Sequence, residues 1–126
     1  MGFLARITAA LGDWKKGGYE LKFITGWRKV YDYGRSHKVN NLRSSYGVFA
    51  LKQGKLVGWL LAQKDGAGSL SPLDVKINSE HRRKGLATSM YQLAEKETNR
   101  KFRRSVQTTD AKKLWGQKNR PFGTDD

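Results

Sequence analysis

Short apolar runs in the middle of the chain predict a small antiparallel sheet. Tyr46–Leu51 and Leu56–Gln63 are apolar stretches joined by a brief link that contains one glycine, which is typical of a β-hairpin. A third strand is predicted over Leu70–Ile77, after a loop rich in glycine. Tyr19–Thr25 is rich in aromatic and β-branched residues and predicts a further strand near the start of the chain.

Alternation within the third predicted strand assigns its residues to two faces. Leu73, Val75 and Ile77 would share one face, and Asp74 would point the opposite way. After Gly85 the apolar period changes to that of a helix, which we expect over residues 85–100.

The outer parts of the chain carry weaker signals. Residues 1–18 place apolar side chains at helical spacing and predict an amphipathic helix, which either packs on the domain or lies on a membrane or partner. Residues 27–44 are basic and aromatic, and their glycine and asparagines interrupt a partly helical pattern. A short strand at 105–108 and a helix that begins near 109 and stops before Pro121 complete the predicted order.

Composition narrows the class of protein. The 126 residues suit a single domain, 1–126, with one core. There is no cysteine, and the only histidines, His37 and His81, lie among basic residues, so we expect no metal site. No apolar run approaches the ~20 residues that span a bilayer, and we expect a cytoplasmic protein without a membrane span. The net charge of +14 leaves open nucleic acid, an anionic membrane, an anionic cofactor or solubility alone.

The segment after the third strand has the pattern of an anion site. A basic loop containing Gly85 leads directly into a helix, whose first N–H groups and positive dipole end attract phosphate. Arg82, Arg83 and Lys84 would add charge-assisted contacts. The chain lacks the glycine and lysine spacing of a nucleoside-triphosphate P-loop, and it lacks the G-x-G-x-x-G of dinucleotide-binding folds. A phosphate or diphosphate is therefore expected here.

The run Arg82-Arg-Lys-Gly85-Leu-Ala87 resembles the Q/R-x-x-G-x-G/A signature of the GNAT family of acetyl-CoA-dependent N-acetyltransferases. The resemblance extends over residues 46–123, because 108–115 looks like a later family helix and 121–123 like its end. It implies an α/β fold with a mixed, mostly antiparallel sheet flanked by helices. It also implies that the third strand pairs with the pantetheine arm of acetyl-CoA while the loop amides hold the pyrophosphate. Carried over by position, the cofactor-binding residues are Val75, Ile77, Arg82, Arg83, Lys84, Gly85, Leu86, Ala87 and Thr88.

Three departures from the family pattern are expected to matter. The tyrosine that many members use as general acid is Trp115 here, and an indole cannot donate a proton to a departing thiolate. The chain ends where the family usually adds two more strands, so the fold would be truncated at its C-terminus. The helices that usually follow the first strand are poorly matched.

The catalytic base is sought near the end of the third strand. GNAT enzymes often place an acid there, and Asp74 is the only carboxylate within that strand. The base must reach the acceptor ammonium, because only the neutral amine attacks a thioester. Glu80 in the following loop is the second candidate, whereas His81 is interpreted as a loop residue.

The resemblance implies transfer of an acetyl group from acetyl-CoA to an amine by direct attack. The acceptor would be a small molecule, a protein or an aminoacyl-tRNA, and compact members resemble those of bacteriophages. The alternative is a weakly active or inactive GNAT-fold binding module for a host protein or nucleic acid. A homodimer could complete the acceptor cleft.

The distribution of charge favours a macromolecular partner. Residues 76–120 hold thirteen Lys and Arg against four acids, a net +9, which exceeds what coenzyme A requires. The basic surface at 100–120 is expected to contact RNA or DNA phosphates. The aromatics Trp27, Tyr31 and Tyr33, near Arg28 and Lys29, could stack on bases.

Overall fold

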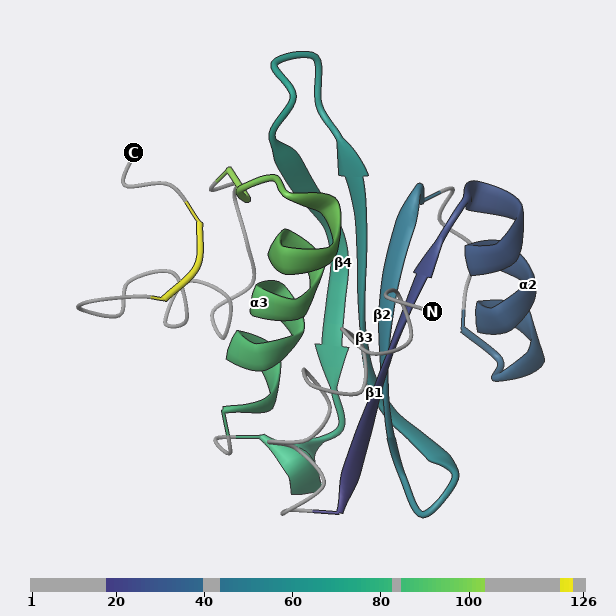
Figure 1. Ribbon diagram of the computed structural model, residues 1–126. Helices are drawn as coiled ribbons and strands as arrows, with labels where there is room; N and C mark the ends of the chain where they lie inside the picture. Colours follow the sequence, from purple (N-terminus) through teal and green to yellow (C-terminus); the bar gives the residue numbers. More distant parts are fainter. Residues whose placement is uncertain (1–17, 40–43, 83–84, 104–120, 124–126) are drawn as a thin grey trace, which may run out of the picture.

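A computed structural model describes residues 18–39, 44–82, 85–103 and 121–123. The described part forms a four-stranded antiparallel sheet in the order β1-β2-β3-β4, with two helices (Figure 1). The elements are β1 (Tyr19–Thr25), α2 (Trp27–Ser36), β2 (Tyr46–Lys52), β3 (Lys55–Lys64), β4 (Leu70–Ile77), the 3₁₀ turn η1 (Ser79–His81) and α3 (Leu86–Thr98). The predicted α/β fold is confirmed, as are the strands predicted over Tyr19–Thr25, Tyr46–Leu51, Leu56–Gln63 and Leu70–Ile77.

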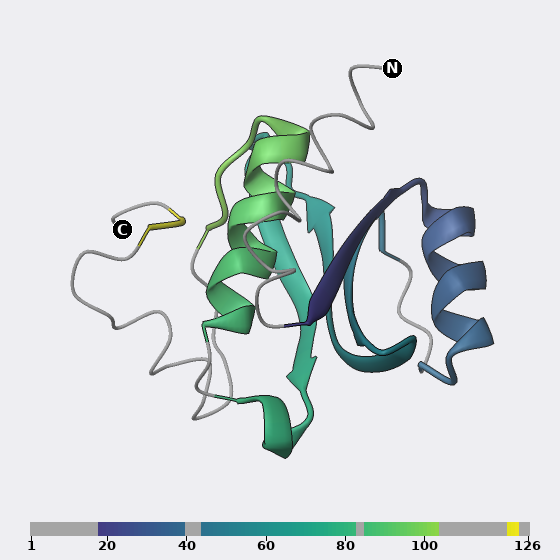
Figure 2. The same ribbon diagram turned by 60° about the horizontal axis from the view of Figure 1, so that its bottom comes forward.

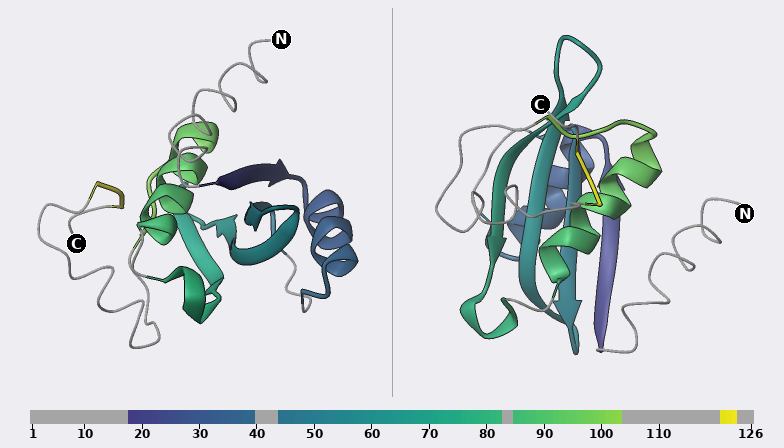
Figure 3. Two further views of the ribbon diagram at one scale, coloured as in Figure 1. Left: turned by 90° about the horizontal axis from the view of Figure 1, so that it is seen from below. Right: turned by 90° about the vertical axis from the view of Figure 1, so that its left-hand side faces the viewer.

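The two helices cover opposite faces of the sheet. Figure 3 shows α3 in front of the sheet and α2 behind it in its right-hand view. The larger core lies under α3, where Leu86 and Met90 pack among residues such as Leu60. The smaller core lies under α2 and is built around Val30 and Phe49. Alternating side chains of one strand therefore supply both cores, as in other sheets buried on two faces.

One face assignment in β4 is wrong. The pairing shifts between Leu61 and Ala62, so that Asp74 lies opposite Leu61 while Pro72 lies opposite Ala62. Leu73 is the extra residue of a β-bulge between them, and it is 37% exposed. It does not share the core-facing side of Val75 and Ile77, because a bulge interrupts the two-residue alternation.

The ambiguous segment 27–44 contains a regular helix, α2. Its sequence predicts an interruption at Gly34, yet the helix continues to Ser36 with Gly34 buried. Gly34 has no positive φ, and a Cβ atom placed there would lie 3.5 Å from the Val39 Cβ, an ordinary van der Waals contact. The glycine is therefore compatible with a continuous helix that packs closely on the chain that follows it.

The sheet extends beyond β4 through the segment that follows α3. Leu70 forms a parallel bridge with Phe102, supported by hydrogen bonds from the Leu70 N–H to the Lys101 carbonyl and from the Arg103 N–H to the Leu70 carbonyl, both 2.8 Å. Pairing thus begins before the strand predicted at 105–108. That strand, the helix predicted at 1–18 and the helix predicted from 109 lie outside the described residues.

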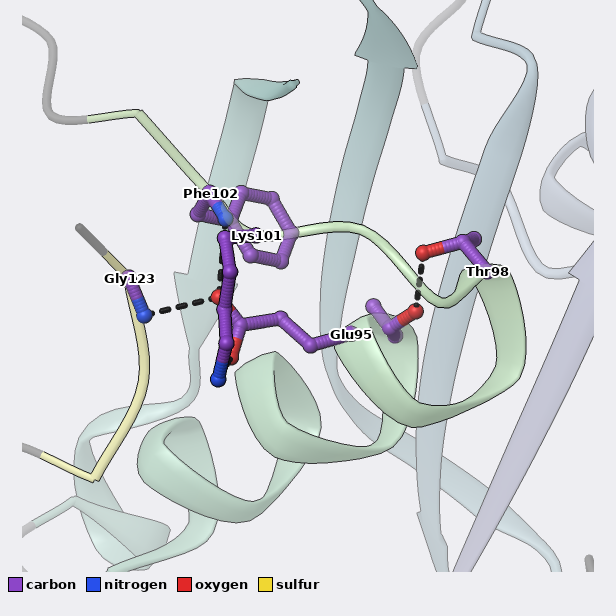
Figure 4. A network of polar contacts seen from close by, with 6 residues as sticks. Glu95, Thr98, Lys101, Phe102 and Gly123 are labelled. Carbon is purple, nitrogen blue, oxygen red and sulfur yellow. Dashed lines mark hydrogen bonds and ion pairs between the residues drawn. The ribbon is translucent and has the colours of Figure 1, made fainter. Parts of the chain in front are cut away.

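A buried carboxylate joins α3 to two later segments. Glu95 is only 7% exposed, and its Oε2 accepts the backbone N–H of Phe102 at 2.8 Å and that of Gly123 at 2.7 Å (Figure 4). The Lys101 ammonium lies 3.5 Å from Oε1 and is largely exposed, so it contributes little by itself. Phe102 and Phe122, which flank these contacts, pack on the buried ring of Tyr91.

We predict that Glu95→Ala lowers the free energy of unfolding by about 2–4 kcal/mol, because two backbone donors lose their charged acceptor. Urea denaturation monitored by circular dichroism measures the loss. The matched control is Glu80→Ala, since Glu80 is exposed. Equal stability of the two variants would contradict the role assigned to the Glu95 carboxylate.

Candidate functional site

The chain turns from β4 into α3 through a left-handed glycine. Gly85 has φ 76° and ψ 9° and immediately precedes the first residue of α3. Residues other than glycine rarely adopt this backbone, and among the described residues, apart from the chain neighbours of Gly85, no atom lies within 4 Å of a Cβ placed there. Space is open around the turn, so a ligand could approach its backbone. Figure 2 brings this end of the sheet, with η1, toward the viewer.

The backbone N–H groups in the first turn of α3 have no capping side chain. Its earliest backbone bond at this end runs from the Ser89 N–H to the Gly85 carbonyl, at 3.2 Å. The N–H groups of Leu86, Ala87 and Thr88 precede that bond, and no side chain caps the helix. The first turn also carries no acid that would repel an anion. The backbone here fits a phosphate group.

The side chains of the other predicted cofactor-binding residues differ in how far they are exposed. Leu86 is buried in the core under α3, so only its backbone faces the turn. Arg82 is exposed, and its Nε donates to the Ile77 carbonyl at 2.9 Å, which folds this side chain back over the end of β4. Arg83 and Lys84 lie outside the described residues. The roles assigned to all these residues remain predictions.

The outer edge of β4 is the second feature of the site. Val75 and Ile77 are partly buried against the core under α3, and β4 is the last strand of the described sheet. On this edge the described chain bridges β4 only at Leu70. The backbone edge from Ser71 to Ile77 is therefore available, within the described part, to hydrogen-bond an extended ligand such as an amide-bearing arm.

Asp74 lies on the face of β4 opposite Val75, as predicted, and in the structure this is the α2 side of the sheet. Its Oδ2 accepts the indole N–H of Trp59 at 2.8 Å. Trp59 packs against the core under α2, and the Lys76 ammonium lies 5.6 Å from its ring centroid. The hydrogen bond fixes the carboxylate beside the β-bulge, on a half-buried surface that an acceptor could reach.

Sequence reasoning missed Trp59, because its relation to Asp74 depends on the register of β3 against β4. It also missed a contact at the opposite end of β4. The Tyr19 hydroxyl lies 2.8 Å from Nδ1 of His81, and the two rings meet edge to face. This bond joins the start of β1 to η1 and so supports the turn that precedes Arg82. Glu80, the second candidate base, is exposed in η1.

Among the described residues, no group of three or more metal-ligating side chains is close enough to hold an ion. No helix in the described ranges has the length and apolar character needed to cross a membrane.

The chain belongs to the acetyltransferase (GNAT) family, whose model matches residues 10–115. Members of this family are acyl- and N-acetyltransferases, so the chain is classed with enzymes. No curated protein sequence matches it.

Solved structures share the fold at low sequence identity. A ribosomal-protein-alanine N-acetyltransferase from Brucella melitensis biovar Abortus 2308 has 16% identity and a TM-score of 0.53, covering 77% of this chain and 88% of its own. A GNAT-family acetyltransferase from Streptococcus pneumoniae TIGR4 has 18% identity and a TM-score of 0.50, covering 74% and 80%. Diaminobutyrate acetyltransferase from Paenibacillus lautus, in complex with L-2,4-diaminobutyric acid and coenzyme A, has 22% identity and a TM-score of 0.40. That match covers 62% of this chain and 58% of the other, less than two thirds of its length.

We predict that Gly85→Val weakens binding of coenzyme A at least tenfold, because a β-branched residue cannot hold the left-handed turn that orients the helix N–H groups. Isothermal titration calorimetry at low salt measures the affinity. Gly66→Val is the control, since Gly66 lies in an exposed turn with open space and no positive φ. The assignment of the loop fails if the two variants bind coenzyme A equally well.

Proposed function

We propose that this protein is an N-acetyltransferase that moves the acetyl group of acetyl-CoA to an amine by direct attack. The observation that carries the proposal is the junction of β4 and α3, where an accessible strand edge ends in a left-handed glycine and uncapped helix N–H groups. Membership of the GNAT family supports the same activity.

The described residues fit the two polar parts of coenzyme A. The N–H groups of Leu86, Ala87 and Thr88 would hold the pyrophosphate, aided by the positive end of the α3 dipole. The edge of β4 near Val75 and Ile77 would pair with the amide groups of the pantetheine arm. We expect Arg82, together with Arg83 and Lys84, to supply positive charge around the phosphates.

When bound, acetyl-CoA supplies an activated thioester. Asp74 is proposed as the base that takes a proton from the acceptor ammonium, directly or through one water. The neutral nitrogen would then form the new C–N bond as the C–S bond breaks, with coenzyme A leaving as the thiolate and the second proton of the nitrogen passing to water. Trp59 is proposed as a positioning residue, because its N–H holds the carboxylate on the acceptor side of the sheet.

No described residue is assigned as general acid. Trp115, which stands where many members have tyrosine, cannot donate a proton to sulfur and lies outside the described residues. The thiolate is proposed to take its proton from water, which is reasonable because thiols ionise at only mildly alkaline pH.

The acceptor is an amine, and the candidates are a protein N-terminus or lysine, a small molecule or an aminoacyl-tRNA. We place the reaction in the cytoplasm, and a second copy of the chain is proposed to complete the acceptor cleft. The alternative function is a GNAT-fold binding module, which the substitution of Trp115 for the usual tyrosine favours.

Calorimetry with acetyl-CoA at low salt tests the proposal, and a broad amine panel then tests turnover. Binding followed by release of free thiol in the presence of one class of amine is expected. Absence of binding at low salt would exclude the enzyme. Binding without turnover against the whole panel would favour the binding module.

We predict that Asp74→Asn lowers kcat/KM at least 100-fold at neutral pH and leaves the affinity for acetyl-CoA unchanged, because an amide cannot accept the ammonium proton. Turnover is followed as thiol release, with acetyl-CoA affinity measured by calorimetry. Glu80→Gln is the control and should retain full activity. Full activity of Asp74→Asn would remove it as the base.

We predict that Trp59→Phe lowers kcat about tenfold with little change in the KM for acetyl-CoA. Phenylalanine keeps an aromatic ring in the core under α2 but has no N–H for the Asp74 carboxylate, and one such hydrogen bond is worth about 1.5 kcal/mol. A variant with unchanged kcat, or one in which only KM changes, would show that the hydrogen bond does not position the base.

A further inference from the structure

One flank of α2 carries an aromatic and basic stripe that the acetyltransferase site does not use. Trp27, Arg28, Tyr31 and Arg35 fall within about 100° of one another around the helix. Trp27 lies beside the buried Gly34, Tyr31 is half-buried, and the exposed Asp32 borders the stripe next to Arg28. Trp27 is 47% exposed, and Leu73 on β4 is the only other large apolar side chain with comparable exposure in the described ranges.

The stripe is positively charged. Residues 27–38 contain four Lys and Arg and one acid, Asp32. The Arg28 guanidinium carbon lies 5.4 Å from the Trp27 ring centroid, so a cation is held next to an exposed aromatic surface. Within the part of the chain that the structure describes, neither Arg28 nor Arg35 forms an ion pair.

The inner side of α2 is held firmly against the sheet. Tyr33 packs on Phe49 with ring centroids 4.6 Å apart and stacks on His37 at 4.5 Å. Burial raises the pKa of the Tyr33 phenol, and the charge of Glu20 raises it further, so the phenol stays neutral at physiological pH. The stripe therefore lies on a helix that is already held in place. Less conformational entropy is lost when a ligand binds to it.

The basic surface predicted at 100–120 is a weaker candidate where it is described. Arg100 donates to the Gly68 carbonyl at 2.6 Å, and Lys101 is paired with Glu95. Arg100 is thus held by the protein, and Lys101 forms a long, largely exposed ion pair, whereas Arg103 is exposed. Most of this basic surface lies outside the described residues, whereas the α2 stripe lies wholly within them.

We propose that this flank of α2 binds single-stranded nucleic acid, with a base stacked on Trp27 and phosphates held by Arg28 and Arg35. Indole stacking accepts any base, and the flanking guanidinium groups match the charge of the backbone. A membrane surface fits less well, because binding to a bilayer scales with buried apolar area and this helix exposes only one large apolar side chain.

The stripe lies on the side of the sheet where the acceptor amine is proposed to bind. α2 packs on the same side of the sheet to which the Asp74 and Trp59 side chains belong. A nucleic acid strand on α2 would lie on that side rather than under α3. The binding surface itself does not depend on acetyl transfer, so it can be tested on the full chain without acetyl-CoA.

The experiment measures fluorescence anisotropy of labelled 12-nucleotide single strands, one of RNA and one of DNA, from 50 to 200 mM salt. Trp27→Ala should weaken binding about 5- to 100-fold, as expected for loss of one stacked base. Trp27→Phe should retain most of the affinity, because it keeps an aromatic face. Binding of either oligonucleotide with this pattern supports the proposal and identifies the kind of strand.

The double variant Arg28→Gln/Arg35→Gln should lower affinity and reduce the salt slope by about 1.4, or 0.7 for each phosphate contact removed. Its matched control is Lys55→Gln/Lys64→Gln, which removes the same charge from exposed positions on β3. Circular dichroism checks that every variant is folded.

The proposal is overturned if Trp27→Ala binds like the unchanged protein, or if both double variants lose affinity equally. Tighter binding to a duplex than to the single strand would also overturn it. The same holds if the α2 variants lose binding only to phosphatidylserine vesicles and keep their affinity for the oligonucleotides. If Trp27→Ala binds acetyl-CoA with unchanged affinity, the α2 stripe is independent of the cofactor site.

Discussion

The turn at Gly85 is the constraint on which the site depends. β4 ends at Ile77 and α3 begins at Leu86, so the chain must reverse within a few residues while Leu86 enters the core. The left-handed backbone of Gly85 permits this reversal and leaves the first N–H groups of α3 facing open space. The packing of Leu86 in the core therefore also fixes the position of the uncapped N–H groups at the start of α3, where an anion could bind. The hydrogen bond between Tyr19 and His81 supports the approach to this turn from β1.

The outer edge and the two faces of β4 have different roles in the proposed reaction. Its outer edge is available to an extended ligand, its α3 side is packed into the larger core, and its α2 side carries Asp74. The β-bulge at Leu73 lies next to Asp74. The regular pairing of β3 with β4 is therefore interrupted beside the proposed base. At the other end of α3, Glu95 joins the segments at Phe102 and Gly123 to the helix and stabilises the region beside β4.

Local patterns predicted most of the described fold. The hairpin and the start and end of β4 follow from apolar runs bounded by glycine, and the anion turn follows from one glycine between a strand and a helix. Features that depend on pairing between distant residues could not be predicted in this way. The exposed position of Leu73 and the bond from Trp59 to Asp74 both require the register of β3 against β4. Gly34 was misleading because glycine is compatible both with a helix end and with a buried position inside a helix, and the packing of α2 on the sheet favours the second.

The most direct measurement is a crystal structure of the protein with coenzyme A. We expect pyrophosphate oxygens within about 3 Å of the N–H groups of Leu86, Ala87 and Thr88. We also expect the pantetheine amides to pair with the outer edge of β4, with the thiol on the side of the bulge. A cofactor bound elsewhere, or phosphates held only by side chains away from this turn, would contradict these expectations.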